Sequence, residues 1–205
     1  MTDTPRTPTP IDTIAEGWVD TAAELAPSLA TYIGRFEYND RLGDQSLAGH
    51  EKMLAAVKDT LATLQAADPV DDVDVVTKAD LSRDLELDIA LHEVGAHLRD
   101  VNVIASPAQE LRNVFDLMPT ATVEDWSVIS TRLGALPGAI RGYIETLREG
   151  IATGVVPARR QVTEVVTQIA RYTADGGFFA EFTSEAAPAE GQLPASLARD
   201  LATSS

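Results

Sequence analysis

The amino-acid sequence predicts an all-α protein, a bundle-like helical lobe of about six to eight helices with no sheet. Apolar residues recur at steps of three and four over long stretches, which is the period of an amphipathic helix. Aromatic residues make up only 5% of the 205 residues, and alanine and leucine dominate the apolar set, which favours helix over sheet. Helix-capping signals separate the periodic stretches, and no stretch alternates convincingly like a strand.

Proline, serine and turn formers mark the helix boundaries in the first third of the chain. Residues 1–10 are rich in threonine and proline, which predicts a flexible tail. A helix begins at Pro10, and the turn formers of residues 28–45 predict a structured loop. Ser46 caps the next helix, which ends before Pro69. Its apolar residues step along one seam: Leu47, His50, Leu54, Val57, Leu61 and Leu64.

The rest of the chain predicts five more helices. We expect them over residues 70–98, 107–117, 123–135, 136–154 and 157–176. Gly134 and Pro137 separate the third from the fourth, because both residues disfavour a helix interior. The last helix is expected to turn Val162, Val166 and Ile169 inward.

The C-terminal part of the chain changes character after an apolar cluster of Phe178, Phe179 and Phe182. We therefore expect one helical domain over residues 11–183. Serine, alanine, proline, glutamate and glycine dominate residues 184–205, which predict a flexible segment. Within it, residues 193–201 begin to resemble a truncated helix.

Composition excludes several classes of function. Hydrophobic residues make up 44%, as in a folded protein. A formal net charge of -16 argues against nucleic acid and against anionic membrane surfaces as partners. The chain has no cysteine, so it can form no disulfide, thiolate zinc site or cysteine nucleophile. The N-terminus lacks the apolar core of a signal peptide, so the cytoplasm is the default expectation.

Two histidines lie close together in the sequence but do not form a zinc motif. A helical zinc motif places its histidines four residues apart, on one face. His92 and His97 are five apart, which rotates them by roughly 140° on a continuous helix at 3.6 residues per turn. We therefore expect no metal site and no cofactor.

Asp88 and His92 are candidates for a polar pocket wall. In the helix expected over residues 70–98, Asp84 and Asp88 fall between two apolar stripes, and His92 follows Asp88 by one turn. One interpretation is a pocket wall in which Asp88 tunes His92. The other is a carboxylate that a core partner satisfies, since an unpaired buried charge is costly.

The loop before residue 46 supplies the remaining candidates, Tyr38, Asp40 and Arg41, with Asp44 nearby. Loops often carry binding residues, but neighbouring aspartate and arginine are also ordinary turn and ion-pair chemistry. The sequence contains no glycine-rich phosphate loop and no nucleophile elbow. It therefore predicts no catalytic residue.

A resemblance that covers most of residues 11–183 is carried by residues 30–34, 38–42, 102–107, 115–119, 122–126, 132–137 and 150–157. Together these segments resemble the N-terminal part of the bacterial domain of unknown function 885 family. The family resembles all-helical metallopeptidases of the gluzincin type, similar to thermostable carboxypeptidases. Its metal motif, His-Glu followed closely by Pro-Gly-His-His, lies far downstream of the matching region and does not occur here.

The resemblance therefore implies a helical N-terminal lobe that would wall a long cleft and be inactive alone, and it assigns no metal ligand. A free-standing helical interaction or small-ligand-binding module is the alternative. A missing C-terminal half would leave apolar surface uncovered and favour self-association. The candidates for such a surface are the seam from Leu47 to Leu64, the phenylalanine cluster and the 193–201 helix.

Overall fold

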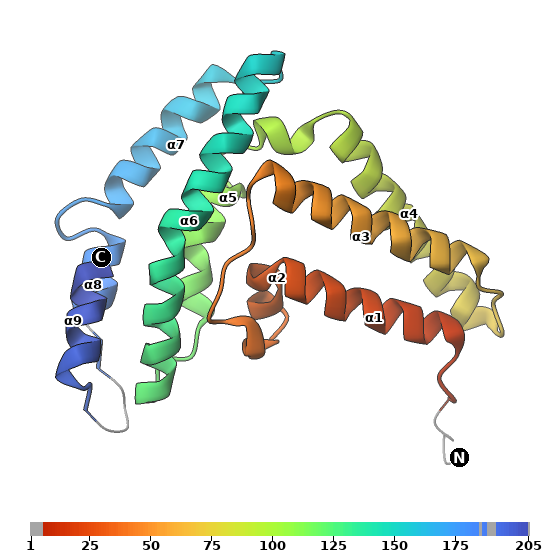
Figure 1. The fold of residues 1–205 in the computed structure, drawn as a ribbon, viewed down its shortest axis with the longest axis horizontal. Helices are drawn as coiled ribbons and strands as arrows, with labels where there is room; N and C mark the ends of the chain where they lie inside the picture. The colour runs from red at the N-terminus through yellow and green to blue at the C-terminus, as the bar shows by residue number, and fades with distance from the viewer. Residues whose placement is uncertain (1–5, 185, 188–191, 205) are drawn as a thin grey trace.

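The computed structural model describes residues 6–184, 186–187 and 192–204, and this part of the chain contains helices and turns but no strand (Figure 1). The all-α prediction is confirmed. The α-helices are α1 Pro10–Leu25, α2 Pro27–Tyr32, α3 Leu47–Ala66, α4 Asp72–Glu93, α5 Pro107–Asn113, α6 Val123–Thr153, α7 Arg159–Tyr172, α8 Phe178–Ser184 and α9 Ala195–Ser204. Three short 3-10 helices are η1 Phe36–Tyr38, η2 Ala96–Arg99 and η3 Val114–Leu117.

Helix α6 lies in the middle of the molecule, with α1, α3 and α4 on one side and α7, α8 and α9 on the other (Figure 1). Its 31 residues span about 46 Å at 1.5 Å per residue. Loop 43–46 and η2 contact it from the first side, and α9 packs along it from the second. Helix α6 therefore joins the two sides of the molecule.

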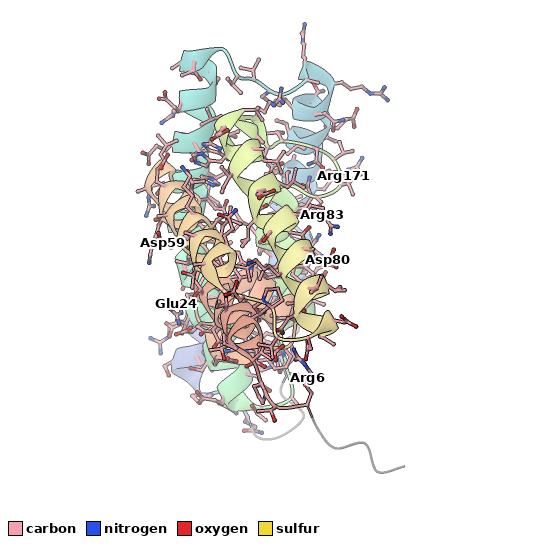
Figure 2. The ribbon with its side chains drawn as sticks, turned by 90° about the vertical axis from the view of Figure 1, so that its right-hand side faces the viewer. Arg6, Glu24, Asp59, Asp80, Arg83 and Arg171 are labelled. Carbon is pink, nitrogen blue, oxygen red and sulfur yellow. The ribbon has the colours of Figure 1, made fainter. Side chains whose placement is uncertain are left out.

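Each side has its own apolar core. On the first side, α1, α3 and α4 enclose a cluster of buried residues: Ile11, Val57, Leu61, Leu64 and Leu85. On the second side, η3, α6 and α9 bury Phe115, Trp126, Ile129, Leu133 and Leu201 among others. The late helix thus inserts Leu201 into a core, and the three phenylalanines of α8 pack against the same cluster half-buried. Charged side chains such as Asp59, Asp80 and Arg83 lie on the outer surface of α3 and α4 (Figure 2).

The predicted break between residues 134 and 137 is wrong, because α6 runs through it with Pro137 in its interior. Proline cannot donate the backbone hydrogen bond to the residue four positions earlier and usually kinks a helix. Here Leu133, Leu136 and Ala139 are all buried around it. Burial of apolar side chains before and after Pro137 outweighs the local cost of a proline in a helix. Helix propensity alone does not include this tertiary contribution.

Two other boundaries also differ from prediction. The helix expected to reach residue 98 ends at Glu93, and Gly95 follows with a φ of 67°, a left-handed conformation that glycine adopts without strain. Residues 28–45 were expected to be a loop, but they contain most of α2 and all of η1. Helix starts fare better, since the side chains of Thr9, Ser46 and Thr122 cap α1, α3 and α6.

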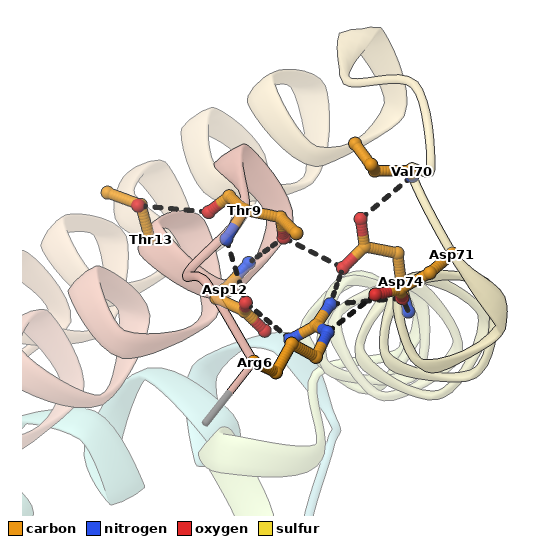
Figure 3. Close-up of polar contacts among 7 residues, drawn as sticks. All are labelled: Arg6, Thr9, Asp12, Thr13, Val70, Asp71 and Asp74. Carbon is orange, nitrogen blue, oxygen red and sulfur yellow. Dashed lines mark hydrogen bonds and ion pairs between the residues drawn. The ribbon is translucent and has the colours of Figure 1, made fainter. Parts of the chain in front are cut away.

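The segment before α1 is held by Arg6, whose guanidinium donates to three carboxylates (Figure 3). The distances are 2.5 Å to Asp12, 2.6 Å to Asp71 and 2.5 Å to Asp74. Asp74 is fully buried and also accepts from the Thr9 hydroxyl at 2.7 Å. The pairing with Arg6 lowers the pKa of Asp71 to about 2. These contacts join the start of α1 to the start of α4.

Of the tail expected over residues 1–10, residues 1–5 lie outside the described part, and residues 6–10 carry the Arg6 network or begin α1. In the described part of the chain, no helix is both long and apolar enough to cross a membrane.

Candidate functional site

The histidines of this chain, three in all, converge on one side of the molecule. His50 comes from α3, His92 from α4 and His97 from η2. The rings of His92 and His97 stack with centroids 4.3 Å apart and planes 15° apart. The ring of His50 lies 4.8 Å from that of His97. The prediction that His92 and His97 face apart is therefore wrong.

Gly95 explains this arrangement. The rotation of about 140° holds only on a continuous helix, and α4 ends at Glu93. The Gly95 amide donates to the His92 carbonyl at 2.9 Å, and the left-handed backbone of Gly95 reverses the chain into η2. His97 is thereby returned to the side of His92.

A pocket of about 320 Å³ opens beside these rings, and we call it the histidine pocket. Apolar side chains from α1, α2 and α3 form much of its wall: Trp18, Leu29, Met53, Leu54 and Val57. The candidates Asp88 and His92 both line it, with Asp88 exposed and His92 half-buried. The nearest acidic partner of His92 is Glu51 on α3, with His92 Nε2 and Glu51 Oε1 3.6 Å apart. In the described part of the chain no hydrogen bond joins Asp88 to His92.

Burial keeps the histidine pocket short of positive charge. Desolvation, reinforced by His50 and His92, lowers the pKa of His97 to about 4. Desolvation also lowers the pKa of His50, and it raises the pKa of Asp88 with help from Asp84. At neutral pH the imidazoles of His50 and His97 are therefore uncharged.

Two imidazole nitrogens of the histidine pocket have no hydrogen-bond partner although they are buried. They are His92 Nε2 and His97 Nδ1. Within the described residues, no group of three or more histidine or acidic side chains is arranged to hold a metal ion. The stacked rings explain this, because parallel imidazoles do not direct their nitrogens toward one common point.

The loop candidates lie elsewhere. Asp40 and Arg41 are exposed and form an ion pair at 3.6 Å, and the Arg41 guanidinium lies 4.9 Å from the centre of the Tyr38 ring. Arg41 borders an adjoining hollow of about 280 Å³, which shares His50 and Met53 with the histidine pocket but does not include Asp88 or His92. The structure thus brings Tyr38, Asp40 and Arg41 together, but not with the other two candidates.

The sequence analysis missed Arg132, which is fully buried in α6. Its Nε donates to the Arg41 carbonyl at 3.0 Å and its Nη1 to the Thr31 hydroxyl at 2.9 Å. Burial lowers the pKa of Arg132 to about 10, with nearby Asp40 and Glu110 opposing the shift. A signal was available, because Arg132 continues the three-residue steps of Trp126 and Ile129 into the core.

A hollow of about 870 Å³ between α6 and α7, which we call the apolar cavity, is larger than the histidine pocket and the hollow that Arg41 borders. Leu133, Leu136, Ile140 and Ile144 line it from α6, and Val162, Val165, Val166 and Ile169 line it from α7. Of the α7 residues only Val165 is buried, and Val166 is 60% exposed. The prediction that Val162, Val166 and Ile169 are inward is therefore wrong, because the apolar stripe of α7 faces open space instead of a packed helix.

The three features proposed as uncovered surfaces are half-buried or buried. Val57, Leu61 and Leu64 of the α3 seam are buried, whereas Leu47 and Leu54 are half-buried. Some of the exposed apolar side chains line the apolar cavity, among them Ile140, Val166 and Ile169, whereas others such as Val76 and Ile104 lie elsewhere. The sequence signal for this cavity was the strong apolar stripe of the helix after Pro157, but a stripe does not reveal what covers it.

Comparison with protein families identifies one match. The profile of a family described as bacterial protein of unknown function (DUF885) matches residues 27–204, which include α2 to α9. A comparison with curated proteins finds no match.

Proposed function

The chain belongs to the DUF885 family of bacterial proteins of unknown function, and we propose that it is a helical binding lobe that takes an apolar ligand and performs no peptidase chemistry by itself. The resemblance to gluzincin-type metallopeptidases implies that such a lobe would wall a substrate cleft. The absence of a metal-binding group among the described residues supports a non-catalytic role.

The observation that carries this proposal is the apolar cavity. Its volume of about 870 Å³ lies within the range of roughly 300–1,000 Å³ for small-molecule sites. Ile140, Ile144, Val166 and Ile169 line it and are each at least 40% exposed, so a ligand there would shield apolar surface from water. Removing about 200 Å² of apolar surface from water gains about 5 kcal/mol, from which the cost of association is subtracted.

The chemistry of the wall defines the ligand. Most lining side chains are aliphatic or aromatic, and the polar groups Arg112, Tyr172 and Asp175 also border the space. Aliphatic walls offer few hydrogen bonds, so they select for shape and apolar area. The expected ligand is therefore a compact or elongated hydrocarbon-rich molecule.

Titration with the neutral apolar dye Nile red tests this assignment. We expect saturable fluorescence enhancement with one dye per chain. Val166→Glu places a carboxylate at the cavity wall and should weaken binding at least tenfold. Val76→Glu on α4 is the matched control, because Val76 is also a valine that is 60% exposed on a helix and does not line the cavity.

Unsaturable dye binding, or an equal loss of affinity in both variants, would contradict the cavity assignment. The non-catalytic part is tested separately by dialysing the chain against zinc and measuring metal content and peptide hydrolysis. We expect neither. Zinc retained one-to-one and lost in His92→Ala would overturn that part.

A further inference from the structure

The histidine pocket is a second hollow, separate from the apolar cavity, and its chemistry selects a different ligand. It is lined by residues of α1, α2, α3, α4 and η2. No residue lines both hollows. Binding in the histidine pocket can therefore be tested independently of binding in the apolar cavity.

Among the described residues, the histidine pocket contains a carboxylate and no side chain with a fixed positive charge. The residues that line it include three histidines and Asp88, and no lysine or arginine. Glu51 adds a second carboxylate next to His92. The chain as a whole carries a formal charge of -16. An anionic ligand would therefore be repelled, whereas a cation would be attracted both at long range and at the pocket.

The unpartnered nitrogens suit the same kind of ligand. A neutral imidazole has one nitrogen that accepts a hydrogen bond. His92 Nε2 and His97 Nδ1 are buried and make no hydrogen bond, although Glu51 Oε1 lies 3.6 Å from His92 Nε2. An ammonium group has three donors and no acceptor, so it can bond to one of these imidazole nitrogens and to a carboxylate at once. The remaining wall is apolar and includes the indole of Trp18, whose ring face attracts cations.

From this arrangement we propose that the histidine pocket binds a small organic amine, with the ammonium between Asp88 and the imidazoles and the apolar body against Trp18, Met53 and Leu54. The volume of about 320 Å³ suits a ligand with one ring or a short branched chain.

A set of three isosteric probes tests the charge requirement by calorimetry. The probes are 2-phenylethylamine, 2-phenylethanol and phenylacetate. We expect saturable binding of the amine, and at least tenfold weaker binding of the alcohol and the acid. Asp88→Asn should weaken binding of the amine at least tenfold. Asp84→Asn on the same helix is the control, because the Asp84 side chain is 68% exposed, pairs with Arg83 and does not line the pocket.

Histidine NMR gives a direct readout, because every histidine of the chain lines this pocket. We expect the amine to shift the imidazole signals of all three residues and Nile red to leave them unchanged. Equal binding of all three probes, unchanged imidazole signals, or equal losses in the two aspartate variants would each refute the proposal. So would one-to-one binding of Zn²⁺ or Ni²⁺ that displaces the amine, since the pocket would then be a metal site.

Discussion

Three glycines on α6 provide a graded test of how closely other segments cross this helix. A methyl group added at Gly134 would meet no atom within 4 Å. At Gly142 it would lie 2.8 Å from the backbone nitrogen of Ser46. At Gly150 it would overlap with the backbone carbonyl oxygens of Leu98 and Val155. The same substitution on one helix thus samples open space, a tight loop crossing and a backbone overlap.

The expected changes follow from two opposing terms. Replacing glycine by alanine in a helix interior gains about 1 kcal/mol of unfolding free energy. Overpacking costs about 1 to 3 kcal/mol, and more where the neighbours are backbone atoms that cannot rotate away. Gly134→Ala should therefore stabilise by about 1 kcal/mol. Gly142→Ala should destabilise by about 1 kcal/mol and Gly150→Ala by about 3 kcal/mol.

Thermal and urea unfolding followed by circular dichroism measure these differences. For a chain of 205 residues, 1 kcal/mol corresponds to about 2–4 °C in Tm. Gly150→Ala should thus lower Tm by about 6–12 °C, while Gly134→Ala raises it by about 2–4 °C. Equal Tm values for the two variants would refute the close crossing of α6 by η2, the element that carries His97.

The remaining predictions concern buried polar groups. Because the pKa of His97 is about 4 in the folded chain and 6.5 without perturbation, the unfolded state binds protons first as the pH falls. The stability that this group contributes is therefore present above pH 6.5 and lost toward pH 4. The expected loss is about 1–2 kcal/mol after discounting for solvent screening. The urea midpoints at pH 6.5 and pH 4 should therefore differ less in His97→Phe than in the unmodified chain. Arg132→Lys should destabilise by about 2 kcal/mol, since lysine cannot reach the Arg41 carbonyl and the Thr31 hydroxyl with one planar fork. Urea unfolding against the exposed control Arg141→Lys checks this, and equal midpoints would refute it.

The sequence predicts helix starts well because their signals are local. The caps at Ser46 and Thr122 involve residues three positions apart, so they read directly from the chain. The end at Glu93 and the continuation through Pro137 depend on what packs around them, and a single helix pattern does not contain that information. Family membership was also readable, because the resemblance rests on short segments spread over most of the chain.

The candidate sites were only partly predictable. Asp88 and His92 line one pocket, but Asp88 is exposed and the partners of His92 come from α3 and η2. Bringing His50 to His97 requires the pairing of α3 with α4, a tertiary contact that periodicity cannot supply. The apolar cavity was missed for a related reason, since the stripe on α7 identifies an apolar face but not an empty neighbour.

The Arg6 network bears on how recombinant fragments of this protein should be cut. A boundary drawn from the family match would begin at residue 27 and discard α1. That cut would remove Ile11 from the core and would deprive Asp74 of both the Arg6 guanidinium and the Thr9 hydroxyl (Figure 3). A fragment that begins at Pro10 would keep Ile11 but would lack Arg6, so Asp74 would have no guanidinium partner. Fragments intended to fold should therefore begin before Arg6, and an affinity tag is better separated from that end by a spacer.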